Sequence, residues 1–216
     1  MKLPQAADNQ AVIARPGGEA IWITDIITPK NPDVMLLYDS LTHGVHTQIE
    51  KIISCWQYVA SIPYKEIVNS KLIVQGKSYT EKDTWLYPAE VIRLAPVANC
   101  ANKSFLLTSL LRNELSAESV RCALGHITFD GIGAHAWVCM DIPEGSFVLE
   151  TTVDNLEKAL LPLNRADAYD PIIYFNDEGV TTLSDSQILE EHFGFCAVKW
   201  LKEYICERCL SLNSPS

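Results

Sequence analysis

The sequence predicts an α+β fold in which a central helix packs against an antiparallel sheet. Three observations lead to this prediction. Apolar side chains between Ala101 and Leu111 form a helical stripe, the most continuous in the chain. From Val120 onward, apolar residues alternate with polar or small ones, which is the period of a strand. The segments between these alternating runs contain Gly and Pro, which favour tight turns.

The segments before the central helix give weaker patterns. Residues 1–45 mix Pro, Gly and short apolar bursts, at 20–25 and 34–38, and we expect short strand or turn pieces laid over the main body. From His46 to Pro63, apolar residues recur at steps of three and four, which predicts an amphipathic helix. The aromatic residues and the proline at 83–90 predict an ordered loop that ends shortly before Cys100.

The central helix should run to Arg112 or Leu115 and be followed by an antiparallel meander. Its three strands are expected near 120–124, 134–140 and 147–151, with turns at 130–133 and 143–146. A further hairpin is predicted from 172–175 and 180–183. Helical spacing returns at 184–209, with Ser184 or Asp185 as the N-cap.

Composition favours one globular domain. A chain of 216 residues, 48% apolar and 20% charged, suits a single domain over 1–216 with its core at about 46–183. The net charge of −10, from 27 acidic and 17 basic residues, repels a phosphate backbone, so no nucleic-acid partner is expected.

The sequence also bears on the cellular compartment. No apolar stretch follows the N-terminus at the length that a signal peptide needs, and no apolar run approaches the roughly 18 residues of a membrane span. Seven cysteines, an odd number, fit reduced thiols better than a disulfide framework. We therefore expect a cytoplasmic protein that does not associate with a membrane.

Cys100 is the candidate nucleophile because it lies where a loop turns into the central helix. The positive end of a helix dipole favours the thiolate, which is the attacking form of cysteine. The alternative is that Cys100 is a small apolar filler, as most cysteines are.

His135 and Glu150 are the candidate partners of Cys100. His135 begins a predicted strand, where His135 and Trp137 share one face, and the imidazole can reach the thiol if that face looks at the helix start. Glu150 ends the next strand, where its carboxylate can accept the Nδ1–H of His135. Each residue taken by itself also has a structural interpretation. His135 could be a strand-edge histidine bonded to a backbone carbonyl, and Glu150 could be a solvated surface carboxylate. Asp154 is a second candidate for the acid.

Four stretches in this order resemble the core of bacterial transglutaminase-like cysteine enzymes. They are Asp83-Thr-Trp-Leu-Tyr-Pro-Ala-Glu, Asn99-Cys-Ala-Asn-Lys-Ser-Phe-Leu-Leu, Ala134-His-Ala-Trp-Val and Val148-Leu-Glu-Thr-Thr. The resemblance covers about residues 50–155 and implies a papain-like fold. It also implies a catalytic triad of Cys100 as nucleophile, His135 as base and then acid, and Glu150 as orienting carboxylate.

The sequence departs from the family pattern near the predicted nucleophile. Family members usually have Gly-Asp before the cysteine and acidic residues after it, whereas Ala98-Asn99 and Ala101-Asn102 stand here. The acid is more often Asp followed by Pro-Thr, where this chain has Glu150-Thr-Thr. The Cys100 N–H is the expected first donor to an oxyanion, and Gln57 and Trp85 are candidates for the second. Packing is the alternative role for Trp85.

Two functional hypotheses follow. The first is an enzyme that attacks amide bonds of a peptide or protein through a thioester: a cysteine peptidase, an amidohydrolase or a transglutaminase-like acyl transferase. The second is a non-catalytic peptide-binding or protein-binding module that retains the fold, supported by the altered flanks of Cys100. No cofactor is expected. A zinc site is disfavoured, because the four possible ligands are spread over several turns of one predicted helix: His192, Cys196, Cys206 and Cys209.

Overall fold

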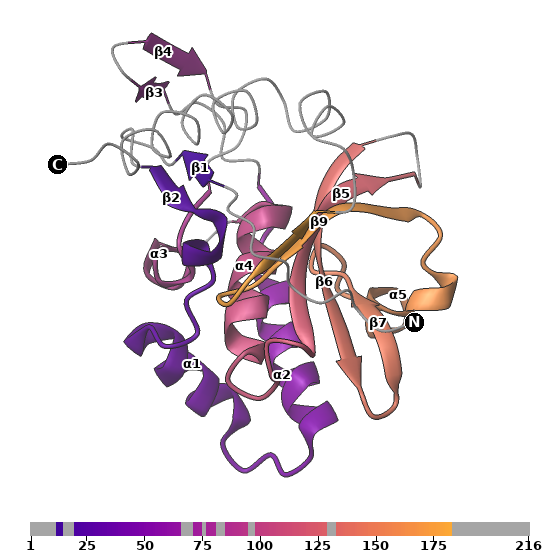
Figure 1. The fold of residues 1–216 in the computed structure, drawn as a ribbon. Coiled ribbons are helices and arrows are strands. Elements are labelled where there is room, and N and C mark those ends of the chain that lie inside the picture. The colour runs from indigo at the N-terminus through magenta and orange to yellow at the C-terminus, as the bar shows by residue number, and fades with distance from the viewer. Residues whose placement is uncertain are drawn as a thin grey trace, which may run out of the picture.

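The computed structural model describes residues 12–14, 20–65, 71–74, 77–80, 85–94, 98–128 and 133–182. Its main feature is an antiparallel six-stranded sheet with the strand order β10-β9-β5-β6-β7-β8. Helix α4 packs against this sheet, and α2 packs against α4 (Figure 1). The predicted α+β architecture is therefore confirmed.

The bounds of the elements are as follows. The main sheet consists of β5 (Val120–Ile127), β6 (Gly133–Ile142), β7 (Gly145–Leu149), β8 (Leu160–Pro162), β9 (Tyr169–Phe175) and β10 (Val180–Thr182). Two small hairpins pair β1 (Val12–Ala14) with β2 (Ala20–Trp22) and β3 (Lys71–Val74) with β4 (Lys77–Thr80). The α-helices are α1 (Pro32–Thr42), α2 (Gln48–Ser61), α3 (Pro88–Leu94), α4 (Cys100–Leu111) and α5 (Leu156–Ala159). Short 3-10 turns span Ile23–Ile26 and Leu163–Arg165.

Helix α4 is buried along its length, from Ala101 to Leu111. Full burial brings polar side chains into the interior, where each needs a hydrogen-bond partner. The ammonium of Lys103 donates to the carbonyls of Ala60 and Ile62, at 3.1 and 2.8 Å, at the C-terminal end of α2. A cation at that position satisfies carbonyls that the helix leaves unpaired and complements its dipole.

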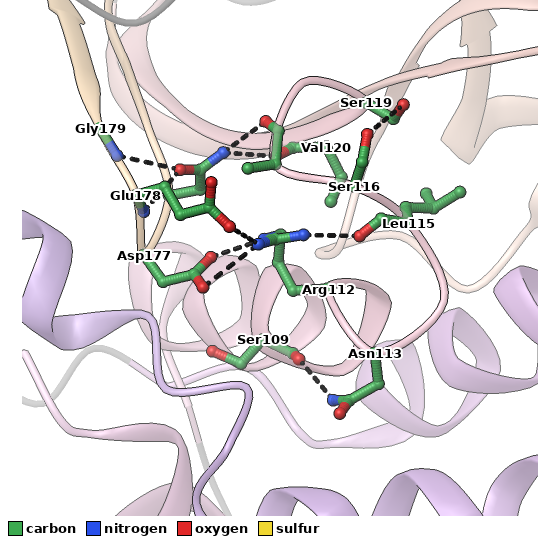
Figure 2. A network of polar contacts seen from close by, with 12 residues as sticks. Ser109, Arg112, Asn113, Leu115, Ser116, Ser119, Val120, Asp177, Glu178 and Gly179 are labelled. Atoms are coloured by element: carbon green, nitrogen blue, oxygen red, sulfur yellow. Dashed lines mark hydrogen bonds and ion pairs between the residues drawn. The ribbon is translucent and has the colours of Figure 1, made fainter.

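The far end of α4 is anchored to the turn between β9 and β10 (Figure 2). The guanidinium of Arg112, the residue after the helix, binds Asp177 through two nitrogens at 2.5 and 3.3 Å, and Glu178 at 2.5 Å. It also donates to the Leu115 carbonyl at 2.6 Å. Hydrogen bonds to several nitrogens of a planar guanidinium fix both the position and the orientation of the Arg112 side chain. The network therefore sets how α4 lies relative to the strands.

Two elements differ from the sequence prediction. The burst at 34–38 belongs to helix α1 and not to a strand or turn; Asn31 caps the helix, Pro32 is its first residue, and the apolar contacts recur at helical steps. The end of the expected loop at 83–90 is the start of helix α3. Both helices were missed because a run of about five apolar residues is too short to reveal its period.

The other predicted elements that lie among the described residues match the structure, whereas α5, β8 and the β3–β4 hairpin had not been predicted. Helix α2, with a capping box formed by Thr47 and Glu50, lies within the predicted 46–63, and α4 begins at Cys100. Strands β5, β6 and β7 form the meander, and β9 and β10 form the hairpin. Gly145 turns the chain between β6 and β7 with a φ of 139°. The helical segment predicted at 184–209, with the cysteines considered for zinc, lies outside the described residues.

Gly125 has no room for a side chain. A bulge between Leu124 and Gly125 brings β9 so close that a Cβ at Gly125 would lie 2.0 Å from the Asp170 carbonyl oxygen. Gly125→Ala should therefore lower the free energy of unfolding by about 2–4 kcal/mol, because backbone must move. Urea unfolding would measure this. Gly133→Ala on β6 is the control, since nothing lies within 4 Å of its Cβ; an equal loss there would contradict the steric explanation.

Within the described residues, none of the helices combines the length and the apolar character needed to cross a bilayer.

Candidate active site

Cys100 is the first residue of α4 and is partly buried. The helix starts here because the Asn99 side chain accepts the Asn102 N–H at 2.9 Å, which is an N-cap. The Cys100 N–H has no acceptor within the helix, since it belongs to the first turn. It is therefore free to donate to a ligand at the helix end. Asn102 in turn accepts the Leu86 N–H at 2.8 Å, which holds residues 85–87 beside this end.

The structure brings His135 and Glu150 together with Cys100. The Nε2 atom of His135 lies 2.8 Å from Oε2 of Glu150, and the two side chains are 9% and 5% exposed. The imidazole also forms a hydrogen bond with the Cys100 side chain. All three predicted residues therefore meet at one end of the helix and sheet.

Two details of this contact differ from the sequence prediction. Glu150 binds Nε2 and not Nδ1, so Nδ1 is the nitrogen left for Cys100. The strand face that carries His135 and Trp137 also does not look at α4: Ala136 and Val138 face the helix, while Trp137 packs in the cluster on the opposite face. His135 lies at the start of β6 and reaches Cys100 around the end of the sheet.

Glu150 is held by more donors than His135 alone. Its Oε2 accepts His135 and the Tyr169 hydroxyl, the latter at 3.0 Å. Its Oε1 accepts the backbone N–H groups of Thr151 and Thr152, both at 2.8 Å, and the Thr152 hydroxyl at 2.7 Å. Five donors saturate the lone pairs of a carboxylate and leave it one orientation. The Glu150 carbonyl is fixed as well, by the indole N–H of Trp56 at 2.7 Å.

The electrostatics of the pair favour two opposite charges. Burial acts to raise the pKa of Glu150, but the hydrogen bond and charge of His135 and the bonds from Thr152 outweigh it and lower that pKa to about 2. Burial acts to lower the pKa of His135, but the hydrogen bonds and charges of Cys100 and Glu150 raise it to about 10. A carboxylate and an imidazolium therefore coexist at neutral pH.

The remaining candidates have other surroundings or roles. Trp85 packs edge-on against Phe105 with ring centroids 5.3 Å apart, which is the packing role considered above. Gln57 lies on the exposed face of α2. Asp154, the second candidate for the acid, is exposed, and Glu150 occupies the position beside His135.

Three residues that hold the site were not found from the sequence: Trp56, Thr152 and Tyr169. Thr152 follows Glu150 closely, so the Thr-Thr pair was a local signal. Trp56 and Tyr169 come from α2 and β9, and nothing near them in the sequence points to Glu150. Within the described part of the chain, no group of three His, Cys, Asp or Glu residues is placed to share a metal ion.

The helix and sheet, with the cysteine and histidine at their common end, define a papain-like, transglutaminase-like fold. No family model and no curated protein matches the sequence. Among solved structures, LapG from Legionella pneumophila is similar, with a TM-score of 0.52 and 18% identity over 78% of this chain and 86% of that chain.

Two further solved structures were compared. EGTA-treated LapG of Legionella pneumophila gives a TM-score of 0.53 and 16% identity over 78% of this chain and 86% of that chain. A candidate cysteine protease from Cytophaga hutchinsonii is 10% identical over 70% of this chain and 48% of that chain, and at its TM-score of 0.38 it carries no argument. At these identities the likeness to LapG shows the fold alone.

Proposed function

We propose that this protein is a cysteine-nucleophile enzyme that hydrolyses an amide bond in a peptide or protein through a thioester. The observation that carries this proposal is the buried pair of His135 and Glu150, whose imidazole bonds Cys100 at the start of α4. A fixed base next to a thiol, with its orientation set by a carboxylate, is the arrangement that nucleophilic catalysis requires.

In the first half of the reaction, the Cys100 sulfur attacks the carbonyl carbon of the substrate as a thiolate, and the imidazolium of His135 carries the proton that the thiol has given up. The negative charge moves to the carbonyl oxygen, where the Cys100 N–H is placed to donate. The tetrahedral intermediate collapses as the C–N bond breaks. His135 passes its proton to the departing nitrogen, so that an amine leaves and a thioester remains.

In the second half, a nucleophile attacks the thioester carbon while His135 takes its proton. The C–S bond then breaks, and the proton stays on His135, which restores the imidazolium beside the free sulfur. Water yields a carboxylic acid, whereas an amine would yield a new amide, as in a transglutaminase-like acyl transfer. We favour water because it is abundant and nothing in the sequence identifies an amine site.

The altered flanks of Cys100, which favoured a non-catalytic binding module, have structural roles. Asn99 caps α4, and Asn102 holds the backbone at Leu86. Both roles leave the thiol, the imidazole and the carboxylate in place. These replacements therefore count against turnover less than the sequence alone implied.

A thiol-reactive peptide amide tests the proposal directly. At pH 7.5 it should label Cys100 at least about 100-fold faster than Cys55. Cys55 is a buried thiol, and its burial and the charge of Glu114 raise its pKa to about 12. Peptide mapping by mass spectrometry measures both rates. Cys100→Ala is the blank, and quenched peptide and glutamine substrates then report turnover. Equal labelling of several cysteines would argue against the enzyme.

A further inference from the structure

We infer that Tyr169 is a positioning residue, whose phenol holds the Glu150 carboxylate in the orientation that pairs it with His135. This inference rests on the proposed function for its catalytic meaning. Its physical content, a hydrogen bond that orients and stabilises the Glu150 anion, can be tested without any substrate.

The contact involves the oxygen that matters for the triad. Tyr169 donates to Oε2 of Glu150 at 3.0 Å, and this same oxygen lies 2.8 Å from Nε2 of His135. The other oxygen is occupied by donors from Thr151 and Thr152. Tyr169 is therefore the donor on the His135 side that does not come from the residues next to Glu150.

The environment of Tyr169 keeps its hydroxyl a hydrogen-bond donor. It is 8% exposed, and burial together with the negative charge of Glu150 raises its pKa far above the ordinary range of tyrosine. The hydroxyl stays protonated at every pH where the protein would work. It can therefore donate to the carboxylate but cannot compete with it for the imidazolium proton.

The ring of Tyr169 is fixed by a second contact with the site. It packs against Trp137 in an edge arrangement, with centroids 5.1 Å apart, and Trp137 in turn stacks on His135 at 6.2 Å. Trp137 lies on β6, which β5 separates from β9, so this contact links two strands that are not neighbours in the sheet. Tyr169 is thus connected to both members of the pair: it donates a hydrogen bond to Glu150, and it packs against the Trp137 indole that stacks on His135.

The alternative is that Tyr169 only fills the core on this face. Tyr169→Phe keeps the ring and removes the donor, which separates the two roles. Tyr174→Phe is the matched control, because Tyr174 is a buried tyrosine of the same strand and the same cluster whose hydroxyl bonds Cys139. Glu150→Gln provides a background in which the carboxylate charge is absent.

Two measurements decide between the roles. The first is the pKa of Glu150, followed by carbon-13 NMR of labelled glutamate in Cys100→Ala protein. It should rise in Tyr169→Phe, because a hydrogen bond to the ionised form is lost, and stay unchanged in Tyr174→Phe. The second is the alkylation rate of Cys100 by iodoacetamide. Tyr169→Phe should lower it about five- to tenfold in the wild-type background and less than about twofold in Glu150→Gln.

An unchanged Glu150 pKa, or an equal loss of alkylation rate in both backgrounds, would overturn the inference in favour of core packing. The proposed function fails separately, if Cys100 of the wild type alkylates no faster than the buried thiols. In that case the NMR titration still decides whether Tyr169 controls the carboxylate.

Discussion

His135→Ala should lower peptide hydrolysis by about 10³-fold, since a positioned general base contributes roughly 10²–10⁴-fold and this residue acts in both halves of the proposed reaction. The described geometry makes the loss specific, because His135 is the group that links Cys100 to Glu150. Initial rates with a quenched peptide at pH 7.5 measure it. KM should change little, since the imidazole is not needed to bind the ground state.

The control for this variant is His43→Ala, which removes an exposed histidine after α1. It should retain the wild-type rate. A comparable loss in both variants, or a His135→Ala protein that keeps more than about a tenth of the activity, would mean that His135 is not the base.

Glu150→Gln should lower hydrolysis at pH 8 by about 10²–10³-fold and change its pH dependence. In the wild type, Cys100 and Glu150 outweigh burial and raise the pKa of His135 to about 10, so activity should persist to the alkaline side. Without the carboxylate, only the hydrogen bond and charge of Cys100 oppose burial, so the pKa of His135 falls and the alkaline limb should move to lower pH. A rate profile from pH 5 to 10.5 would show the shift.

Asp154→Asn is the matched control for Glu150→Gln, because it neutralises an exposed carboxylate four residues away. Its profile should coincide with that of the wild type. If Asp154→Asn moved the alkaline limb and Glu150→Gln did not, the acid would have to be reassigned.

The same variant tests the ion pair through stability. The folded pKa of Glu150, about 2, lies below its ordinary value of 4.5, so its contribution to stability is present above pH 4.5 and is lost as pH falls through about 2. The folded pKa of His135, about 10, lies above its ordinary value of 6.5, so its contribution to stability is present below pH 6.5 and is lost as pH rises through about 10. The stability difference between the wild type and Glu150→Gln should therefore be largest between pH 4.5 and 6.5.

The elements that the sequence predicted best are those with long periodic patterns. Helices α2 and α4 and strands β5 to β7 each show several repeats of their period, so local spacing was enough to predict them. Helix α1 was missed because its apolar burst was interpreted without the start signal of Asn31 and Pro32. A capping residue followed by proline can therefore decide between a helix and a strand where the apolar pattern is short.

The way the site is held together needed the three-dimensional structure. Alternation along one strand specifies neither which nitrogen of His135 binds Glu150 nor which face of β6 looks at α4. Trp56 and Tyr169 contact Glu150 from 94 and 19 residues away. Nothing in the segments around them signals these contacts.

The sequence by itself determined which three residues meet: Cys100 at a helix start, then His135 and Glu150 on successive strands. The order of the motifs along the chain, together with their resemblance to transglutaminase-like enzymes, contains this information. Only the tertiary structure decided how the three are oriented and how the charges of His135 and Glu150 are stabilised. The physical reason is that side-chain orientation, burial and hydrogen bonding depend on neighbours brought together from distant parts of the chain, which no local pattern encodes.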